Sequence, residues 1–380
     1  MDMTTPALVA GLALLLTVLW DAFETMVLPR RVTRRVRLAR LFYRFTWRPW
    51  SAITRRLPAG KRRESFLSFF GPLSLLFLVT FWALGLVLSF GLLQYGCGSE
   101  VAAPGRAPDF ITDLYLSATT FFTLGMGDVT PHSGLARMLT AIEAGVGFGF
   151  LAIVIGYLPV IYQSFSRREV NISLLDARAG SPPTAGELLR RHAFPGGLDA
   201  LQRLLSDWER WSAELMESHL SYPMLAYFRS QHDNQSWLAS MTAILDTCAL
   251  LMAGVEGACA RQAELTFAIA RHAIVDLAQI FIARPDAADG GRLGAEALQS
   301  LRTNLAPRGL HLSSSAAADQ RLAQLRALYE PYVTTLGRYL NLEIPALIPE
   351  AARKDNWQTT VWDRSSAVLH DARGIRDDHH

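Results

Sequence analysis

The sequence contains little cysteine and little charge. Its 380 residues include three cysteines, Cys97, Cys248 and Cys259, and none of them stands in a CxxC or Cys/His spacing. Neither a disulfide framework nor a structural zinc site is therefore indicated. Charged residues make up 19% of the chain and hydrophobic residues 50%. This balance is too apolar for an ordinary soluble protein and indicates a membrane protein.

Acidic residues are missing from one stretch in particular. Between Arg30 and Arg63 the chain has thirteen basic residues and no acidic one. Residues 65–168 have four basic against five acidic residues, and residues 169–380 have 20 against 25. The excess positive charge is thus confined to one segment, and the composition gives no reason to expect a nucleic-acid partner.

Three apolar stretches, residues 6–28, 65–93 and 135–165, are long enough to be membrane helices. About 20 apolar residues cross the roughly 30 Å hydrocarbon core of a bilayer. The positive-inside rule places the basic stretch and the pair Arg167 and Arg168 in the cytoplasm. We therefore expect an all-α, multi-pass protein of the cell (inner or plasma) membrane whose C-terminal part is cytoplasmic.

Two carboxylates, Asp21 and Glu24, lie near the end of the first apolar stretch. They are three residues apart and share a helix face, and carboxylates are costly inside a membrane. We predict that they pair with the arginines that follow. The alternative is that the helix leaves the hydrocarbon by about Trp20.

The basic stretch also carries aromatic residues, including Phe42, Trp47 and Trp50. Arginines beside aromatic rings suit a helix in the headgroup region, where guanidinium groups bind phosphates. We therefore expect residues 30–63 to bind anionic membrane lipids. Arginines at every third position from Arg31 to Arg40 also resemble a voltage-sensing helix, but only one spanning segment precedes them to supply counter-charges. The interfacial helix is the favoured interpretation.

Residues 110–131, between the second and third apolar stretches, are too short to span a membrane, so we expect them to enter it and return. Irregular backbone at that depth is stable only where it is buried in protein or lines a watery path. Residues 109–122 are typical of a short helix whose C-terminus directs partial negative charge toward such a path. The next residues read Thr-Leu-Gly-Met-Gly-Asp, from Thr123 to Asp128. Alternating glycines permit backbone angles that turn successive carbonyl oxygens to one side.

This arrangement resembles the potassium channel superfamily, in its form with two helices and a pore loop. The resemblance covers residues 65–168 and rests on the TLGMGD tract between two spanning helices. It implies that K⁺ ions, with no organic cofactor, bind in a selectivity filter. One tract per chain implies a homotetramer. The implied filter residues are Thr123, Leu124, Gly125, Met126 and Gly127, with Asp128 at the outer mouth.

One filter position departs from the family, which usually has Tyr or Phe where this chain has Met126. Methionine is flexible, so its packing against Phe121, Phe122 and Tyr115 is expected to brace the filter less firmly. Because the rest of the tract is present, potassium selectivity is favoured. The alternatives are a non-selective monovalent cation channel and a membrane sensor or scaffold with a vestigial pore.

The third apolar stretch carries four glycines, and the resemblance places one of them, Gly147, at the family's gating hinge. Close packing of helices is the alternative explanation for such glycines. Helical spacing from Gly147 directs Phe150 or Leu151, Val154 and Leu158 toward the axis. All of these side chains are apolar, so we predict a hydrophobic inner cavity.

Glu143, one turn before Gly147, places a carboxylate within the membrane. Such a residue indicates function by default. We predict that Glu143 reaches the back of the filter and makes gating sensitive to pH. A solvated or subunit-paired Glu143 is the alternative.

The C-terminal half shows helical spacing of apolar residues. Gly, Pro and Ser predict a linker over residues 169–186. Residues 237–258 are apolar enough for a fourth span, but Asp246 and the charges that follow favour a buried soluble helix. No nucleophile and base stand out, so we do not expect an enzyme. The predicted helices cover 185–220, 237–283, 294–305 and 316–340.

These patterns divide the chain into five parts. We predict an N-terminal transmembrane helix (1–29), a basic interfacial segment (30–64), a pore domain (65–168), a helical cytosolic domain (169–350) and a flexible tail (351–380). Cys97 falls in the outer loop, where a free thiol is favoured over a disulfide between subunits. The stimulus that gates the pore is not indicated by any motif.

Overall fold

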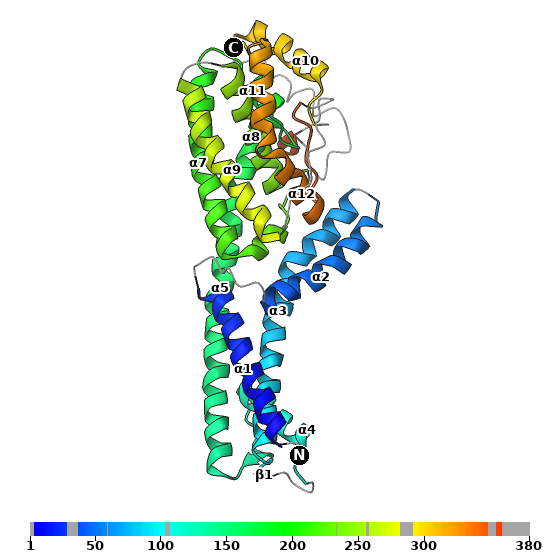
Figure 1. The fold of residues 1–380 in the computed structure, drawn as a ribbon, viewed down its shortest axis with the longest axis vertical. Coiled ribbons are helices and arrows are strands. Elements are labelled where there is room, and N and C mark those ends of the chain that lie inside the picture. The colour runs from blue at the N-terminus through cyan, green and yellow to red at the C-terminus, as the bar shows by residue number, and fades with distance from the viewer. Residues whose placement is uncertain are drawn as a thin grey trace. The chain divides into compact units, whose positions relative to one another are not determined.

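The chain is mostly helical and forms two compact units, Met1–Gln163 and Ser164–His380 (Figure 1). The computed structural model describes residues 4–28, 37–58, 60–102, 107–232, 234–255, 258–281, 292–348 and 355–358. The all-α membrane fold predicted from the sequence is confirmed. Within the described residues, four helices are long and apolar enough to cross a membrane, namely α1, α3, α5 and α8.

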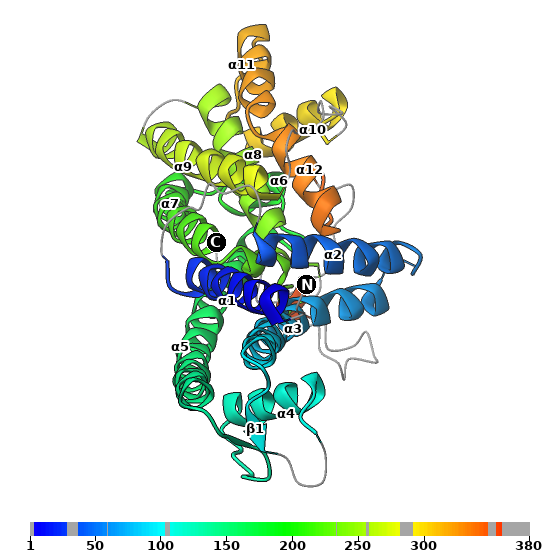
Figure 2. The same ribbon diagram turned by 60° about the horizontal axis from the view of Figure 1, so that its bottom comes forward.

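The first unit is organised around α3, which packs against α1, α2 and α4. Both views place the short helix α4 beside α3 (Figure 2). The two-residue strands β1 (Val101–Ala102) and β2 (Thr130–Pro131) pair antiparallel and close the loop that contains α4. The helices are α1 (Thr4–Met26), α2 (Leu38–Arg55), α3 (Lys61–Gly96), α4 (Phe110–Phe121) and α5 (Gly134–Ala179).

The acidic residues of α1 hold the start of α2. Asp21 is fully buried and accepts hydrogen bonds from the backbone N–H groups of Leu38 and Ala39, at 2.8 and 2.9 Å. The indole N–H of Trp82 on α3 also donates to Asp21, at 3.0 Å. A carboxylate at a helix N-terminus satisfies orphan N–H groups and interacts favourably with the helix dipole. Asp21 therefore joins three helices.

The second carboxylate behaves as the sequence predicts. Glu24 forms an ion pair with Arg37, at 3.6 Å, and accepts a hydrogen bond from the Trp20 indole at 2.7 Å. The predicted pairing with the following arginines is thus confirmed at Arg37, whereas Asp21 binds mainly backbone N–H groups and an indole. Residues 29–36 lie outside the described part of the chain.

Helix α2 presents two chemically different surfaces. One surface packs on α3, where the Trp50 ring stacks on Phe66 with centroids 4.4 Å apart and Trp47 meets Phe70 at 4.8 Å. The other is exposed and carries arginines beside an apolar side chain, Phe45, which is 70% exposed. The exposed arginines of α2 are Arg40, Arg44, Arg48 and Arg55.

Helix α5 is longer than the sequence predicts. The apolar stretch was expected to end at the Arg167–Arg168 pair and to be followed by a linker, but the helix continues to Ala179. Residues 169–179 contain no proline or glycine, and Ile172, Leu175 and Ala179 recur at helical spacing and are buried. The linker prediction is therefore wrong for residues 169–179, and the helix ends where Gly180 and the prolines begin.

The second unit packs the end of α5 with shorter helices. Two predicted helices are each divided in two: the first by a turn around Gly196, and the second into α8, which ends at Gly254, and α9, which begins at Ala258. The remaining boundaries lie close to those expected. The helices are α6 (Ala185–Arg191), α7 (Gly197–Ser221), α8 (Trp237–Gly254), α9 (Ala258–Phe281), α10 (Ala295–Leu305), α11 (Ala316–Ala327) and α12 (Glu330–Leu340), with a 3₁₀ turn η1 at Pro223–Tyr227.

Helix α8 meets the length and hydropathy of a membrane span but is buried within the second unit. Every residue from Trp237 to Leu251 is buried. Its Asp246 forms an ion pair with Arg292 and accepts a hydrogen bond from the Tyr329 hydroxyl. A buried carboxylate with these partners supports the predicted soluble helix.

Candidate functional site

Helix α4 begins at a capped N-terminus and lies against α3. The Asp109 carboxylate accepts from the backbone N–H of Thr112 at 2.9 Å and from its hydroxyl at 2.7 Å. This is the side-chain cap that stabilises helix starts by about 1 kcal/mol. Near the other end, the Ser117 hydroxyl lies 2.7 Å from the carbonyl oxygen of Val87 on α3. The short helix predicted before the tract is therefore present.

The chain leaves α4 through a tight turn. The carbonyl of Thr119 accepts hydrogen bonds from the backbone N–H groups of Leu124 and Gly125, at 2.7 and 3.2 Å. The N–H of Thr123 donates to Thr120 O at 3.0 Å. These bonds fix the direction in which the TLGMGD tract departs from the end of the helix.

The tract has an alternating backbone. Thr123, Gly125 and Gly127 have φ angles of 56°, 51° and 77°, in the left-handed region, while Leu124 and Met126 do not. Glycine adopts this region without steric cost, whereas Thr123 adopts it with strain. Alternation of this kind is what turns successive carbonyl oxygens to the same side. All six residues from Thr123 to Asp128 are exposed in the single chain.

Met126 has one of its three predicted aromatic contacts. The Tyr115 hydroxyl donates to the Met126 sulfur at 3.5 Å and also interacts with Asp128. Phe121 instead lies in the core, and Phe122 is 60% exposed. The expected packing of Met126 against Phe121 and Phe122 is thus not seen, because the end of α4 directs Phe121 toward α3 and α5.

Glu143 of α5 lies against α4. Its side chain is fully buried, and one carboxyl oxygen is hydrogen-bonded to Ser117 while the other has no partner in the described structure. The Ser117 oxygen is also within hydrogen-bond distance of Val87 O. A hydroxyl has one proton, so it cannot donate to both acceptors. A protonated Glu143 that donates to Ser117, which in turn donates to Val87, satisfies all three groups.

At Gly147 the backbone of α5 lies close to the end of α4. A Cβ atom at Gly147 would collide with the carbonyl oxygen of Phe121. Phe150, one turn further, packs on the Phe121 ring with centroids 5.9 Å apart. Close helix packing, the alternative left open by the sequence, therefore accounts for Gly147 in this structure.

The other predicted cavity residues differ in exposure. Leu151 is 54% exposed, while Val154 and Leu158 are half-buried. Of the pair left open by helical spacing, Phe150 packs toward Phe121 and Leu151 is the exposed side chain.

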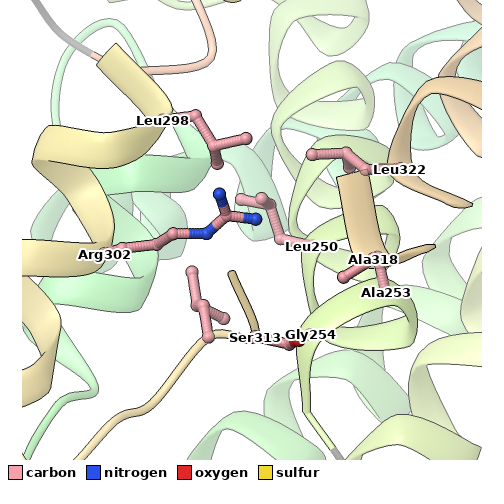
Figure 3. Close-up of a pocket in the computed structure, with 9 residues that line it drawn as sticks. Leu250, Ala253, Gly254, Leu298, Arg302, Ser313, Ala318 and Leu322 are labelled. Atoms are coloured by element: carbon pink, nitrogen blue, oxygen red, sulfur yellow. The ribbon is translucent and has the colours of Figure 1, made fainter. Parts of the chain in front are cut away.

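The second unit holds no comparable site among the described residues. Its shallow pocket between α8, α10 and α11 is lined mainly by leucine and alanine, with Arg302 pointing in (Figure 3). Arg302 is paired with Asp319 at 2.5 Å. No group of three His, Cys, Asp or Glu side chains able to hold a metal is found in the described ranges, and Cys97, Cys248 and Cys259 are free thiols there.

The sequence did not reveal the role of two buried polar residues, Ser117 beside the tract and Arg168 in the second unit. Ser117 is one of many serines, and nothing in its sequence neighbourhood marks it as the partner of Glu143. The sequence indicated only that Arg168 ends the third apolar stretch on the cytoplasmic side, whereas the structure shows it 3% exposed within the second unit. An arginine directly after an apolar stretch usually lies at the membrane surface. The sequence signal for its burial was the helical spacing of the apolar residues Ile172, Leu175 and Ala179 that follow it.

Comparison with known proteins supports the channel resemblance. Residues 74–163 match the family described as "Ion channel". An uncharacterized membrane protein of Bacillus subtilis (strain 168), YdjJ, is 28% identical over 186 residues, which are 47% of this chain and 52% of that protein. Two-pore potassium channel 3 of Arabidopsis thaliana is 31% identical over 68 residues, 18% of this chain and 16% of that protein.

The chain spans about half the length of the first relative and about a sixth of the second. No solved structure matches the chain. The family match covers α4, the TLGMGD tract and the neighbouring parts of α3 and α5. The protein is therefore a membrane protein whose residues 74–163 match an ion-channel domain, and this match supports the resemblance to the potassium channel superfamily.

Proposed function

We propose that the protein is a potassium-selective channel whose filter is the TLGMGD tract. The observation that carries this proposal is the alternating backbone of Thr123, Gly125 and Gly127 directly after α4. Four such strands around an axis replace the hydration shell of K⁺ with carbonyl oxygens. Thr123, Leu124, Gly125 and Met126 supply the oxygens in this proposal.

A homotetramer follows from the same reasoning, because each chain has one tract and a closed ring needs four. The exposure of the whole tract in the single chain supports this assembly. Helix α5 also exposes large apolar side chains along its length, which lipid and neighbouring copies would cover. They include Leu135, Met138, Ile142, Phe148, Leu151 and Ile155.

The reversal potential tests the proposed selectivity. The purified protein would be placed in planar bilayers with K⁺ on one side and Na⁺ on the other. A potential near the K⁺ equilibrium value is expected, and Met126→Tyr should leave it there or sharpen it. A potential near zero with clear current would instead identify a non-selective cation channel. No current under any condition would favour the vestigial pore.

A filter-disrupting variant provides the control for this experiment. Gly125→Ala places a Cβ at a φ of 51° and should abolish the current without preventing tetramer formation. Gly134→Ala, at the start of α5 and with no atom close to the added Cβ, should conduct like the wild type.

Glu143 is the proposed filter-coupled acid. Its hydrogen bond to Ser117 joins α5 to α4, the helix that ends at the tract. Loss of the Glu143 proton would leave two acceptors, the Glu143 carboxylate and Val87 O, with only the Ser117 hydroxyl hydrogen to share. We propose that gating responds to pH through this group, and that Gly147 keeps α5 close enough for the bond to form.

The basic face of α2 is the proposed contact with anionic lipids. We also propose that this face and the second unit lie on the cytoplasmic side of the cell membrane. The exposed Arg40, Arg44 and Arg48 beside Phe45 support this proposal. Flotation with vesicles should show tighter binding to phosphatidylglycerol than to phosphatidylcholine. Equal binding to both lipids would contradict the proposed lipid contact without affecting the proposed channel function.

The match to an ion-channel family favours a non-enzymatic role for the protein.

A further inference from the structure

The final part of α5 belongs to the second unit rather than to the channel domain. The helix runs without interruption from Gly134 to Ala179, and the second unit begins at Ser164. The same helix therefore carries Gly147, in the first unit, and Arg168, in the second. Arg168 is buried, with 3% of its surface exposed.

The Arg168 guanidinium is surrounded by hydrogen-bond partners of the second unit. Nη1 donates to Leu225 O at 2.9 Å and lies 3.3 Å from the His219 ring nitrogen Nε2. Nη2 donates to Phe228 O at 2.9 Å, and both Nε and Nη2 lie 2.9 Å from the Glu169 carboxylate. A guanidinium has five N–H groups, and four of them have a hydrogen-bond partner here, while Nη2 also forms an ion pair with the Glu169 carboxylate.

The backbone of Arg168 is also held. The indole N–H of Trp211 on α7 donates to its carbonyl at 3.1 Å. The Phe165 ring lies 5.1 Å from the guanidinium carbon, which is within the range of a cation–π interaction. Arg168 therefore fixes the end of α5 to both α7 and the turn that follows it.

The hydrogen bonds also fix the protonation state of His219. Its Nδ1 lies 2.9 Å from the Leu215 carbonyl, which can only accept, so Nδ1 carries a proton. Its Nε2 faces Arg168, which can only donate, so Nε2 carries none. His219 is therefore neutral. A second proton on Nε2 would place two cations in contact and remove one acceptor from Arg168.

We propose that Arg168 is the positioning residue through which the second unit controls α5, the long helix that follows the TLGMGD tract. We further propose that the hydrogen bonds of Arg168 require a neutral His219. The inference rests on the proposed channel function for its effect on current but not for its effect on structure. Acidification of the cytoplasmic side protonates His219, releases Arg168 and frees residues 164–179 from the second unit.

Among the described residues, no carboxylate is recorded in contact with His219, and the Glu169 carboxylate lies against Arg168 instead. Arg168 is the charged group that acts on it, and the other groups that face it are the Leu215 carbonyl, the Ser218 hydroxyl and the Trp237 ring at 5.5 Å. Burial, followed by the charge of Arg168, lowers the pKa of His219 well below its ordinary value. Each pH unit below about 6.5 then weakens the bound state about tenfold until the native pKa is reached.

Hydrogen exchange of the full-length protein in lipid nanodiscs tests this without any current. At pH 7.5, Arg168→Gln and Arg168→Lys should both speed the exchange of amides in residues 164–179 about tenfold or more. Glutamine removes the charge and most of the donors, and lysine keeps the charge but has three donors and a different shape. The neighbouring Arg167→Gln, an exposed arginine on the same helix, should leave exchange unchanged. Equal exchange in the wild type and in Arg168→Gln would overturn the proposal.

The proton dependence needs a second comparison. Between pH 7.5 and 5, after correction for intrinsic rates, exchange of residues 164–179 should rise in the wild type but stay constant in His219→Gln, whose amide oxygen accepts and does not titrate. His192→Gln controls for the other buried histidine, which contacts Leu188 O and not Arg168. A pH response that survives in His219→Gln would refute the role of His219.

Single-channel recording completes the test. The open probability at pH 7.5 should change in the same direction in Arg168→Gln as it does when the wild type is acidified on the cytoplasmic side. His219→Gln should lose that acid response. If exchange changes as expected but no variant carries current, the positioning role of Arg168 stands and the channel function is rejected. If exchange changes but the open probability does not, Arg168 fixes the end of α5 without controlling the current, and only that control is rejected.

Discussion

Ser117 on α4 and Glu143 on α5 share one hydrogen bond directly behind the turn that leads into the TLGMGD tract. Both side chains are fully buried, and the proton count requires the acid to be neutral. The helix that ends at the tract and the helix that lines the channel domain are thus joined by a single titratable group. This arrangement links the protonation of one residue to the geometry of the tract.

Glu143→Gln should abolish the pH dependence of gating at the alkaline end. The wild type is expected to change open probability when the pH is raised enough to ionise Glu143, whereas glutamine keeps a neutral donor and acceptor. Open probability recorded from pH 6 to 10 provides the measurement. Retention of the alkaline response in the variant would disprove this role for Glu143. Glu100→Gln, in the loop outside the helices, provides the matched control.

Gly147→Ala should impair the channel domain far more than Gly145→Ala. The Cβ at position 147 would collide with the Phe121 carbonyl, whereas at position 145 it meets no atom within 4 Å. A backbone collision costs about 1–3 kcal/mol or displaces the helix. Tetramer recovery by size-exclusion chromatography and current amplitude should both fall for the first variant. Equal behaviour of the two alanines would show that the close approach does not matter.

Asp21→Asn should loosen the start of α2. The substitution replaces an ionised acceptor of three N–H groups, and loss of charge-assisted hydrogen bonds in a buried site costs about 1–3 kcal/mol. The thermal unfolding midpoint in detergent should fall, and the amides of Leu38 and Ala39 should exchange faster. Asp207→Asn, at an exposed carboxylate, serves as the control. An unchanged midpoint and unchanged exchange would contradict the capping role.

Glu187→Gln should remove part of the acid sensitivity of the second unit. Burial raises the pKa of Glu187, but hydrogen bonds and charges from Arg190 and Arg191 outweigh it and lower the pKa to about 2. A lowered folded-state pKa adds stability above the unfolded value, near 4.5, and this stability is lost as the pH falls from there toward about 2. Unfolding midpoints across that window should therefore fall less steeply in the glutamine variant. Parallel curves for both proteins would count against the ion pairs.

The sequence predicts correctly those elements that depend on residues close together in the chain. The apolar lengths predict α1, α3 and α5, and the glycines at positions 125 and 127 predict the alternating backbone. Asp21, Glu24 and Glu143 were recognisable as costly in a membrane. Their partners were recognisable only in part, because Ser117 and Trp82 lie far away in the sequence and carry no local signature.

The extent of α5 could not be predicted for a related reason. An arginine pair after an apolar stretch normally marks the membrane surface, and the glycines and prolines of residues 180–183 suggested a wider linker. What continues the helix is the burial of Ile172, Leu175 and Ala179 within the second unit. Tertiary contacts thus determine the boundary between the helix and the linker.

The hydrophobic cluster around Trp82 has a consequence for transplanting this pore. Val18 and Ala22 of α1 and Ala39 of α2 share that cluster with Trp82 and with Phe121 at the end of α4. A chimaera that takes only residues 65–168 into another channel would leave three of these side chains behind and open a void beside Phe121, just before the TLGMGD tract. Helix α1 is therefore part of the hydrophobic core of the channel domain, and a functional graft has to begin upstream of Val18.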